Sequence, residues 1–142
     1  MPNIIDNPTG LFKVTQNIFL LNNKKQFVIL KHKSGPWLLP GGRLAQGESP
    51  EQGLRREIEE ELSIKDFNIQ KVLKMDTWID KTILYLGILY LGTLSSDKIV
   101  LSEEHTDYKW IGTLSDLKGI NFWNDSLSNK VIEFLQSINE RE

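Results

Sequence analysis

Residues 41–64 constrain the fold more than any other part of this chain. They read GGRLAQGESPEQGLRREIEEELSI, a glycine-rich turn followed by a segment rich in glutamate. Ser49 suits the N-cap of a helix, Pro50 suits the first helical position, and Gln52 completes a capping-box pattern. These signals predict a helix that begins at Ser49 and continues to about Leu62.

The predicted helix carries two stripes of side chains at about 100° per residue. The apolar stripe, which should face the core, consists of Leu54, Ile58 and Leu62. The acidic stripe beside it consists of Glu57, Glu60 and Glu61. Like charges at these spacings destabilise a helix by about a few tenths of a kcal/mol per pair, which favours a cation between them. Hard oxygen ligands suit Mg²⁺ or Mn²⁺. The alternative is a solvated acidic face partly neutralised by Arg55 and Arg56.

The whole stretch resembles the Nudix box, G-x5-E-x7-R-E-U-x-E-E-x-G-U, in which U is a bulky aliphatic residue. The matching residues are Gly42, Glu48, Arg56, Glu57, Ile58, Glu60, Glu61 and Ile64. One position departs, because Ser63 stands where the box has a glycine that usually closes the helix in a left-handed conformation. Serine adopts this conformation less readily, so the departure concerns the geometry of the following loop. It removes none of the charged groups.

The resemblance implies an α/β fold, the Nudix α/β/α sandwich with a mixed central sheet. It implies a divalent-metal-dependent hydrolase that cleaves the pyrophosphate of a nucleoside diphosphate linked to another group X. The implied ligands of Mg²⁺ or Mn²⁺ are the Gly41 carbonyl, Glu57, Glu60, Glu61 and Glu104. The implied catalytic residues are Arg56, Glu57, Glu60 and Glu104. Arg56 is expected to orient the acidic cluster together with Glu48, and the general base is either Glu57 or Glu104.

A second likeness lies in residues 102–110, SEEHTDYKW. They are similar to the S-x-E-H-x-x-Y-x-W pattern of diadenosine tetraphosphate hydrolases, and to the same region of several nucleoside triphosphate pyrophosphatases. Glu104 matches the acid of the pattern, so we predict that it reaches the site from outside the helix, whereas Glu103 and Asp107 do not. The substrate stays open among nucleoside triphosphates, dinucleoside polyphosphates, ADP-ribose and nucleotide sugars.

Substrate binding is assigned to Arg43, Tyr85 and Tyr108. The aromatic side chains able to stack on a base are Trp78, Tyr85, Tyr108 and Trp123, and core packing is the alternative for each. Trp37 is interpreted as a packing residue. The basic cluster of residues 31–33 either contacts phosphates or ends a solvated strand.

Composition narrows the classes of function. The chain has 142 residues, 39% apolar and 25% charged, which is ordinary for a soluble protein and predicts one domain over residues 1–142. A net charge of -2 gives no reason to expect a nucleic-acid duplex or a membrane surface as partner. The absence of cysteine excludes disulfides and thiol nucleophiles, and with them a Nudix isomerase that uses a cysteine. A non-catalytic nucleotide sensor is the remaining alternative, although such domains typically lack box carboxylates and none is missing here. The N-terminus does not resemble a signal peptide, so a cytoplasmic protein is expected, and a homodimer is compatible with the sequence.

Elsewhere the sequence predicts an irregular lead-in over residues 1–10, strands over residues 11–21, 26–32, 67–80 and 81–94, and a short strand over residues 37–40. The segment 81–94 is almost continuously apolar, which favours a central strand buried on both faces. Helical spacing of apolar residues predicts a closing amphipathic helix, and the residues concerned are Leu127, Val131, Phe134, Leu135 and Ile138.

Overall fold

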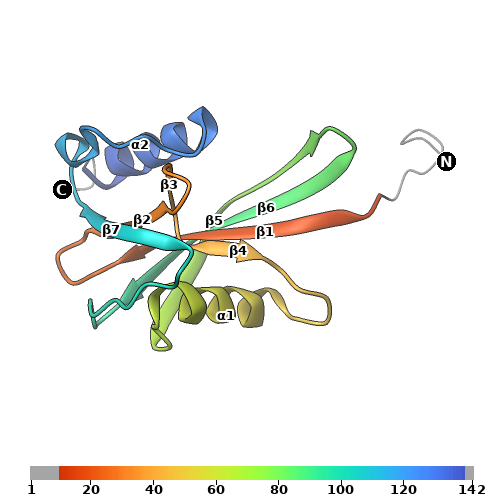
Figure 1. Ribbon diagram of the computed structural model, residues 1–142, viewed down its shortest axis with the longest axis horizontal. Coiled ribbons are helices and arrows are strands. Elements are labelled where there is room, and N and C mark those ends of the chain that lie inside the picture. The colour runs from red at the N-terminus through yellow and green to blue at the C-terminus, as the bar shows by residue number, and fades with distance from the viewer. Residues whose placement is uncertain (1–9, 140–142) are drawn as a thin grey trace.

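A computed structural model describes residues 10–139, which form a mixed sheet between two α-helices (Figure 1). The elements are β1 (Phe12–Leu21), β2 (Phe27–His32), β3 (Trp37–Leu38), β4 (Gly41–Arg43), α1 (Pro50–Leu62), β5 (Phe67–Asp80), β6 (Ile83–Leu94), β7 (His105–Ile111), the 3-10 helix η1 (Leu114–Leu117) and α2 (Asp125–Asn139). Helix α1 covers one face of the sheet and α2 the other, so the predicted α/β/α sandwich is confirmed. The predicted lead-in lies outside the described residues apart from Gly10.

The strands β3, β2, β1, β6 and β5 are neighbours in that order, while β4 also pairs with β1 and β7 with β2. Strands β1 and β6 run parallel, from Phe12 opposite Leu84 to Leu21 opposite Thr93. The remaining strand pairs are antiparallel among the described residues. The short strand β4, which contains Gly41 and Gly42, therefore lies against β1 and above α1. A ligand can approach the backbone there.

Alternation along the central strands builds one core on each face of the sheet. On the α1 side the core includes Ile18, Leu20, Val28, Leu30, Leu54, Ile58 and Leu62. On the α2 side it includes Phe19, Phe27, Ile29, Leu91, Ile111, Val131, Phe134 and Leu135. The predicted apolar stripe of α1 is thus buried, and that of α2 is buried at Val131, Phe134 and Leu135 and partly buried at Leu127 and Ile138. No helix among residues 10–139 is long and apolar enough to cross a membrane.

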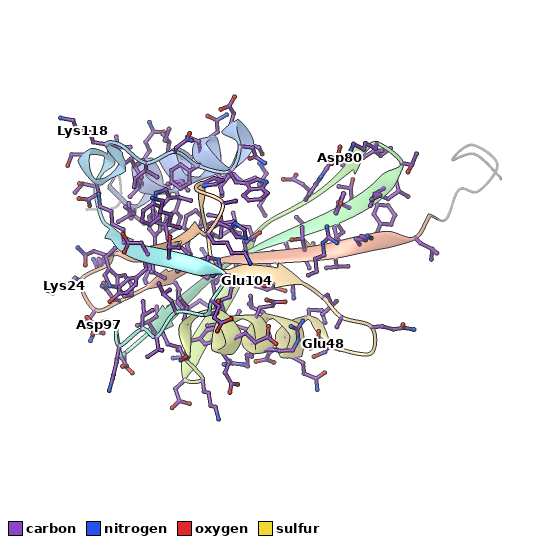
Figure 2. The ribbon with its side chains drawn as sticks, viewed as in Figure 1. Lys24, Glu48, Asp80, Asp97, Glu104 and Lys118 are labelled. Carbon is purple, nitrogen blue, oxygen red and sulfur yellow. The ribbon has the colours of Figure 1, made fainter. Side chains whose placement is uncertain are left out.

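The expectation that segment 81–94 is buried on both faces is wrong for its first half. From Ile83 to Leu89 the strand is only half-buried, and burial begins at Tyr90. The reason is that the β5–β6 hairpin extends past both helices, with Asp80 at its tip (Figures 1 and 2). Near the tip the strand has no helix above or below it, whereas Ile88 and Leu89, further from the tip, pack against the two cores.

Both ends of α1 follow the local signals in the sequence. The Ser49 side chain accepts the Gln52 N–H, and the Gln52 side chain accepts the Ser49 N–H, so the predicted capping box is present. Ser63 ends the helix in the left-handed conformation, with φ 59°, that the family's glycine normally adopts. Its hydroxyl donates to the Val100 carbonyl at 3.1 Å, a contact that glycine cannot make.

Candidate active site

The two glycines of β4 allow the backbone to lie directly against its neighbours. Gly41 has φ +145°, and a Cβ there would lie 1.9 Å from the Gln16 carbonyl oxygen. A Cβ on Gly42 would lie 2.4–2.7 Å from the atoms of the Glu57 carboxyl group. A side chain at either position would clash with these neighbours, so both positions require glycine. The Glu57 carboxylate of α1 can then contact the backbone at Gly42.

Arg56 joins the turn before α1 to the acidic stripe. Its Nε donates to Glu48 Oε2 at 2.7 Å, and its Nη2 donates to Glu48 Oε1 at 3.0 Å, which makes the pair bidentate. Its Nη1 donates to Glu57 at 3.0 Å and lies 3.4 Å from Glu60. The hydrogen bond from Arg56 lowers the pKa of Glu48, and the Ala45 N–H adds to this effect. Lysine has no planar fork and could not hold this arrangement.

Glu61 is the buried member of the acidic stripe, with 7% of its surface exposed. Its Oε1 accepts the Gly41 N–H at 2.7 Å, and its Oε2 lies 3.5 Å from His105 Nε2. Burial raises the pKa of Glu61 to about 8; the Gly41 hydrogen bond opposes the rise, and the charges of Glu57 and Glu104 reinforce it. Burial likewise raises the pKa of Glu57. The protein alone therefore disfavours the ionised forms of Glu57 and Glu61.

Glu104 reaches the cluster from a loop that is hydrogen-bonded to the end of α1. The Val100 N–H donates to the Leu62 carbonyl at 3.1 Å, and the Ser102 N–H donates to the Glu61 carbonyl at 3.3 Å. These bonds satisfy helix carbonyls that otherwise lack partners. Figure 2 shows Glu104 at the start of β7, above α1. The structure thus brings together the four predicted carboxylates from two separate segments.

The four carboxylates line one small cleft of about 410 Å³. Its lining residues are Gly41, Gly42, Arg43, Glu57, Glu60, Glu61, Ser102 and Glu104. Within residues 10–139, no three acidic or histidine side chains lie close enough together to enclose an ion unaided. An open cleft lined by carboxylates suits Mg²⁺, which keeps several waters and shares its coordination with substrate phosphates.

A larger cleft of about 860 Å³ shares Gly41, Gly42, Arg43, Glu61 and Glu104 with the acidic cleft. One wall carries a stacked pair, Trp78 and Tyr85, with ring centroids 5.4 Å apart and planes 13° from parallel. The Arg43 guanidinium lies 5.9 Å from the Tyr85 centroid. Gly87 makes room for this arrangement, since a Cβ there would lie 2.6 Å from the Trp78 ring. The cleft thus combines an aromatic wall with access to the carboxylates.

The structure separates the remaining sequence candidates. Arg43 and Tyr85 line the larger cleft, as do His32 and Trp123, whereas Tyr108 and Trp37 line neither cleft. Glu103 and Asp107 are exposed and also lie outside both clefts. The sequence did not point to three residues that line a cleft. Lys74 and Asp76 line the larger cleft, and Ser102 lines the acidic cleft. Alternation along β5 was the available signal, because Lys74, Asp76 and Trp78 share one face of that strand.

The buried Glu61 predicts a pH-dependent stability in a buffer that contains a metal chelator. Between the ordinary pKa of 4.5 and about 8, the folded protein keeps a proton that the unfolded chain has lost. The free energy of unfolding should therefore fall as pH rises through this window, by at most about 1.4 kcal/mol per pH unit. Urea unfolding between pH 5 and pH 8 measures this slope. Glu61→Gln should flatten it and Glu59→Gln should not; equal slopes in all three proteins would contradict the assignment.

Similarity to known proteins agrees with this geometry. The fold is similar to that of a MutT protein from Methanosarcina mazei Go1, with a TM-score of 0.73, 22% identity, and coverage of 90% of this chain and 95% of that one. Nucleoside triphosphatase NudI of Enterobacter sp. (strain 638) is 29% identical over 108 residues, which are 65% of this chain and 77% of that protein. NudI of Escherichia fergusonii is 35% identical over 88 residues, 54% of this chain and 62% of that protein, so the match spans less than two thirds of its length. A family model for the NUDIX domain matches residues 11–128. The chain belongs to the Nudix family.

Proposed function

We propose that this protein is a divalent-metal-dependent Nudix hydrolase that cleaves a pyrophosphate bond in a nucleoside diphosphate derivative. The observation that carries the proposal is the acidic cleft, in which Glu57, Glu60, Glu61 and Glu104 meet beside the open aromatic cleft. The NudI relatives are described as nucleoside triphosphatases, so nucleoside triphosphates are the first substrates to test. A non-catalytic sensor has no comparable support, because every box carboxylate is present and Glu57, Glu60 and Glu61 line the acidic cleft. A cytoplasmic location stays a prediction.

Mg²⁺ or Mn²⁺ would be held by the Glu57, Glu60, Glu61 and Glu104 carboxylates, with the Gly41 carbonyl as a further ligand. When bound, the ion neutralises phosphate oxygens and polarises the phosphorus for attack by water. Burial raises the pKa values of Glu57 and Glu61, so a bound cation would supply the positive charge that stabilises their ionised forms.

Arg56 and Glu104 have the remaining roles, which are to position the acidic stripe and to activate the attacking water. Arg56 holds Glu57 through the 3.0 Å ion pair, which limits the freedom of that carboxylate to approach a water. Within residues 10–139, no hydrogen bond or ion pair fixes the Glu104 side chain, which faces both clefts. Glu104 is therefore our choice for the base that orients or deprotonates the attacking water, and Arg56 positions the acidic stripe.

The aromatic wall is proposed to bind the nucleoside base. Stacking of a base on an aromatic ring contributes about 1–3 kcal/mol, so Tyr85→Ala should raise KM by about tenfold with a smaller change in kcat. Tyr108→Ala changes an exposed tyrosine outside both clefts and should leave KM within about twofold. Steady-state kinetics on one nucleotide substrate measures both. A larger rise in KM for Tyr108→Ala than for Tyr85→Ala would show that the base binds at Tyr108 on β7 instead.

A substrate panel tests the proposed function. Purified protein is incubated with Mg²⁺ and nucleoside triphosphates, dinucleoside polyphosphates, ADP-ribose or nucleotide sugars, and the products are separated by chromatography. We expect cleavage within the phosphate chain of at least one class, and no cleavage by Glu57→Gln/Glu60→Gln double-variant protein. The absence of cleavage across the panel, from protein that is folded and binds Mn²⁺, would favour the sensor alternative.

A further inference from the structure

His105 is a buried residue in the lining of the larger cleft, and it has no role in the function proposed above. Only 2% of its side chain is exposed, and Glu61, whose side chain is 9% exposed, lies against it. His105 Nδ1 lies 3.3 Å from the Ser102 hydroxyl, on the side of the ring opposite Glu61. Burying an imidazole costs free energy that an apolar ring of similar size avoids. The polar contacts of His105 therefore require an explanation beyond packing.

The two contacts indicate which ring nitrogen carries the proton. With a cation bound, Glu61 would be ionised and would only accept hydrogen bonds, so its contact with Nε2 is then attractive when Nε2 is the protonated nitrogen. Nδ1 then accepts a hydrogen bond from the Ser102 hydroxyl. Ser102 also donates its own N–H to the Glu61 carbonyl at 3.3 Å, so its backbone and side chain fix both the helix end and the ring.

We propose that His105 is a positioning residue that holds the Glu61 carboxylate in the orientation that binds a divalent cation. The inference rests on the proposed function, because it takes Glu61 as a metal ligand. The Gly41 N–H holds Oε1 at 2.7 Å, and His105 faces Oε2 from the other side at 3.5 Å. A contact at each of its two oxygens leaves the carboxylate little freedom to rotate away from the cleft.

The position of His105 directly after Glu104 in the sequence fits this role. The Glu104 carbonyl accepts the Lys33 N–H at 2.8 Å, which fixes the backbone between the two side chains. Glu104 then faces the cleft while His105 is buried against α1's last turn. Residues 104–105 therefore supply the Glu104 carboxylate to the cleft, and through His105 they support the Glu61 carboxylate of α1.

Mn²⁺ binding, measured by the electron paramagnetic resonance signal of the free ion, tests the role without relying on turnover. Groups that support metal ligands typically contribute about 10–100-fold in metal affinity. His105→Phe keeps a ring but loses both polar contacts, and it should weaken Mn²⁺ binding by about tenfold or more. His105→Gln can place an N–H near the position of Nε2, and it should bind within about threefold of the parent. Thermal unfolding in chelator shows whether each variant is folded.

A double-mutant cycle then separates positioning from a general effect on the fold. In a Glu61→Gln background, His105→Phe should change Mn²⁺ affinity by less than about twofold, because the group it positions is gone. Undiminished binding by folded His105→Phe protein, or an equal loss in both backgrounds, would overturn the inference. If His105→Phe does not fold, His105→Asn replaces it, since asparagine reaches Ser102 but not Glu61. Failure of the parent to bind Mn²⁺, or parent-like binding by Glu61→Gln, would instead overturn the metal site itself.

Discussion

Replacing Glu60 or Glu61 with glutamine should lower kcat by about two to three powers of ten while the protein stays folded. Loss of one group that stabilises charge in a transition state typically costs about this much. Glutamine keeps an oxygen that can accept the Gly41 N–H in place of Glu61, and Glu60 is an exposed side chain that forms only a 3.4 Å contact with Arg56. For Glu60→Gln, loss of a negative charge also relieves repulsion along the helix. Steady-state kinetics and thermal unfolding measure the two properties separately.

Glu59→Gln is the matched control for this experiment. Glu59 is on the same helix, is exposed, pairs with Lys65 at 3.6 Å, and lies outside both clefts. Its replacement by glutamine should leave kcat within about twofold, because Glu59 lines neither cleft, and should change stability little, because exposed ion pairs contribute little to it. Near-normal turnover by Glu60→Gln or Glu61→Gln would show that the metal is not bound by the acidic stripe.

Glu104→Gln should lose most of kcat, by about two powers of ten or more, with little change in thermal stability. General bases typically contribute about 10²–10⁴-fold. Among the three acids of its loop, Glu104 is the one that lines both clefts, whereas Glu103 and Asp107 are exposed outside them. Kinetics at saturating Mg²⁺ make the loss in kcat independent of weaker metal binding.

Glu103→Gln and Asp107→Asn are the controls, and each should stay within a few-fold of the parent. Glu103 adjoins Glu104, so it tests whether any charge lost from this loop is enough. The Asp107 side chain accepts the Tyr108 N–H at 2.8 Å, so it tests local structure at the start of β7. An equal or larger loss at either position would mean that a different carboxylate approaches the water.

The parts of the site that local signals encode could be predicted from the sequence. The capping residues Ser49 and Gln52 mark where α1 begins, and helical spacing alone places Glu57, Glu60 and Glu61 on one side of it. The likeness of residues 102–110 to a known pattern indicated Glu104. Each inference needs only the order of residues along one element, which is why it does not depend on the rest of the fold.

The features that depend on distant segments could not be predicted in the same way. The pattern of segment 81–94 is that of a buried strand, but the length of the β5–β6 hairpin carries its first half beyond both helices. The burial of His105 against Glu61 requires the loop before β7 to fold back on α1. Tyr108 matched its pattern, yet its register opposite Leu30 on β2 leaves it outside both clefts.

The metal dependence of hydrolysis tests the central claim most directly. The best substrate of the panel is incubated with protein that has been exhaustively treated with chelator, and Mg²⁺ is then added back in steps. We predict no turnover without the ion, because the four carboxylates repel a polyphosphate, and recovery of full activity as Mg²⁺ saturates the cleft. Undiminished hydrolysis in excess chelator would contradict the account.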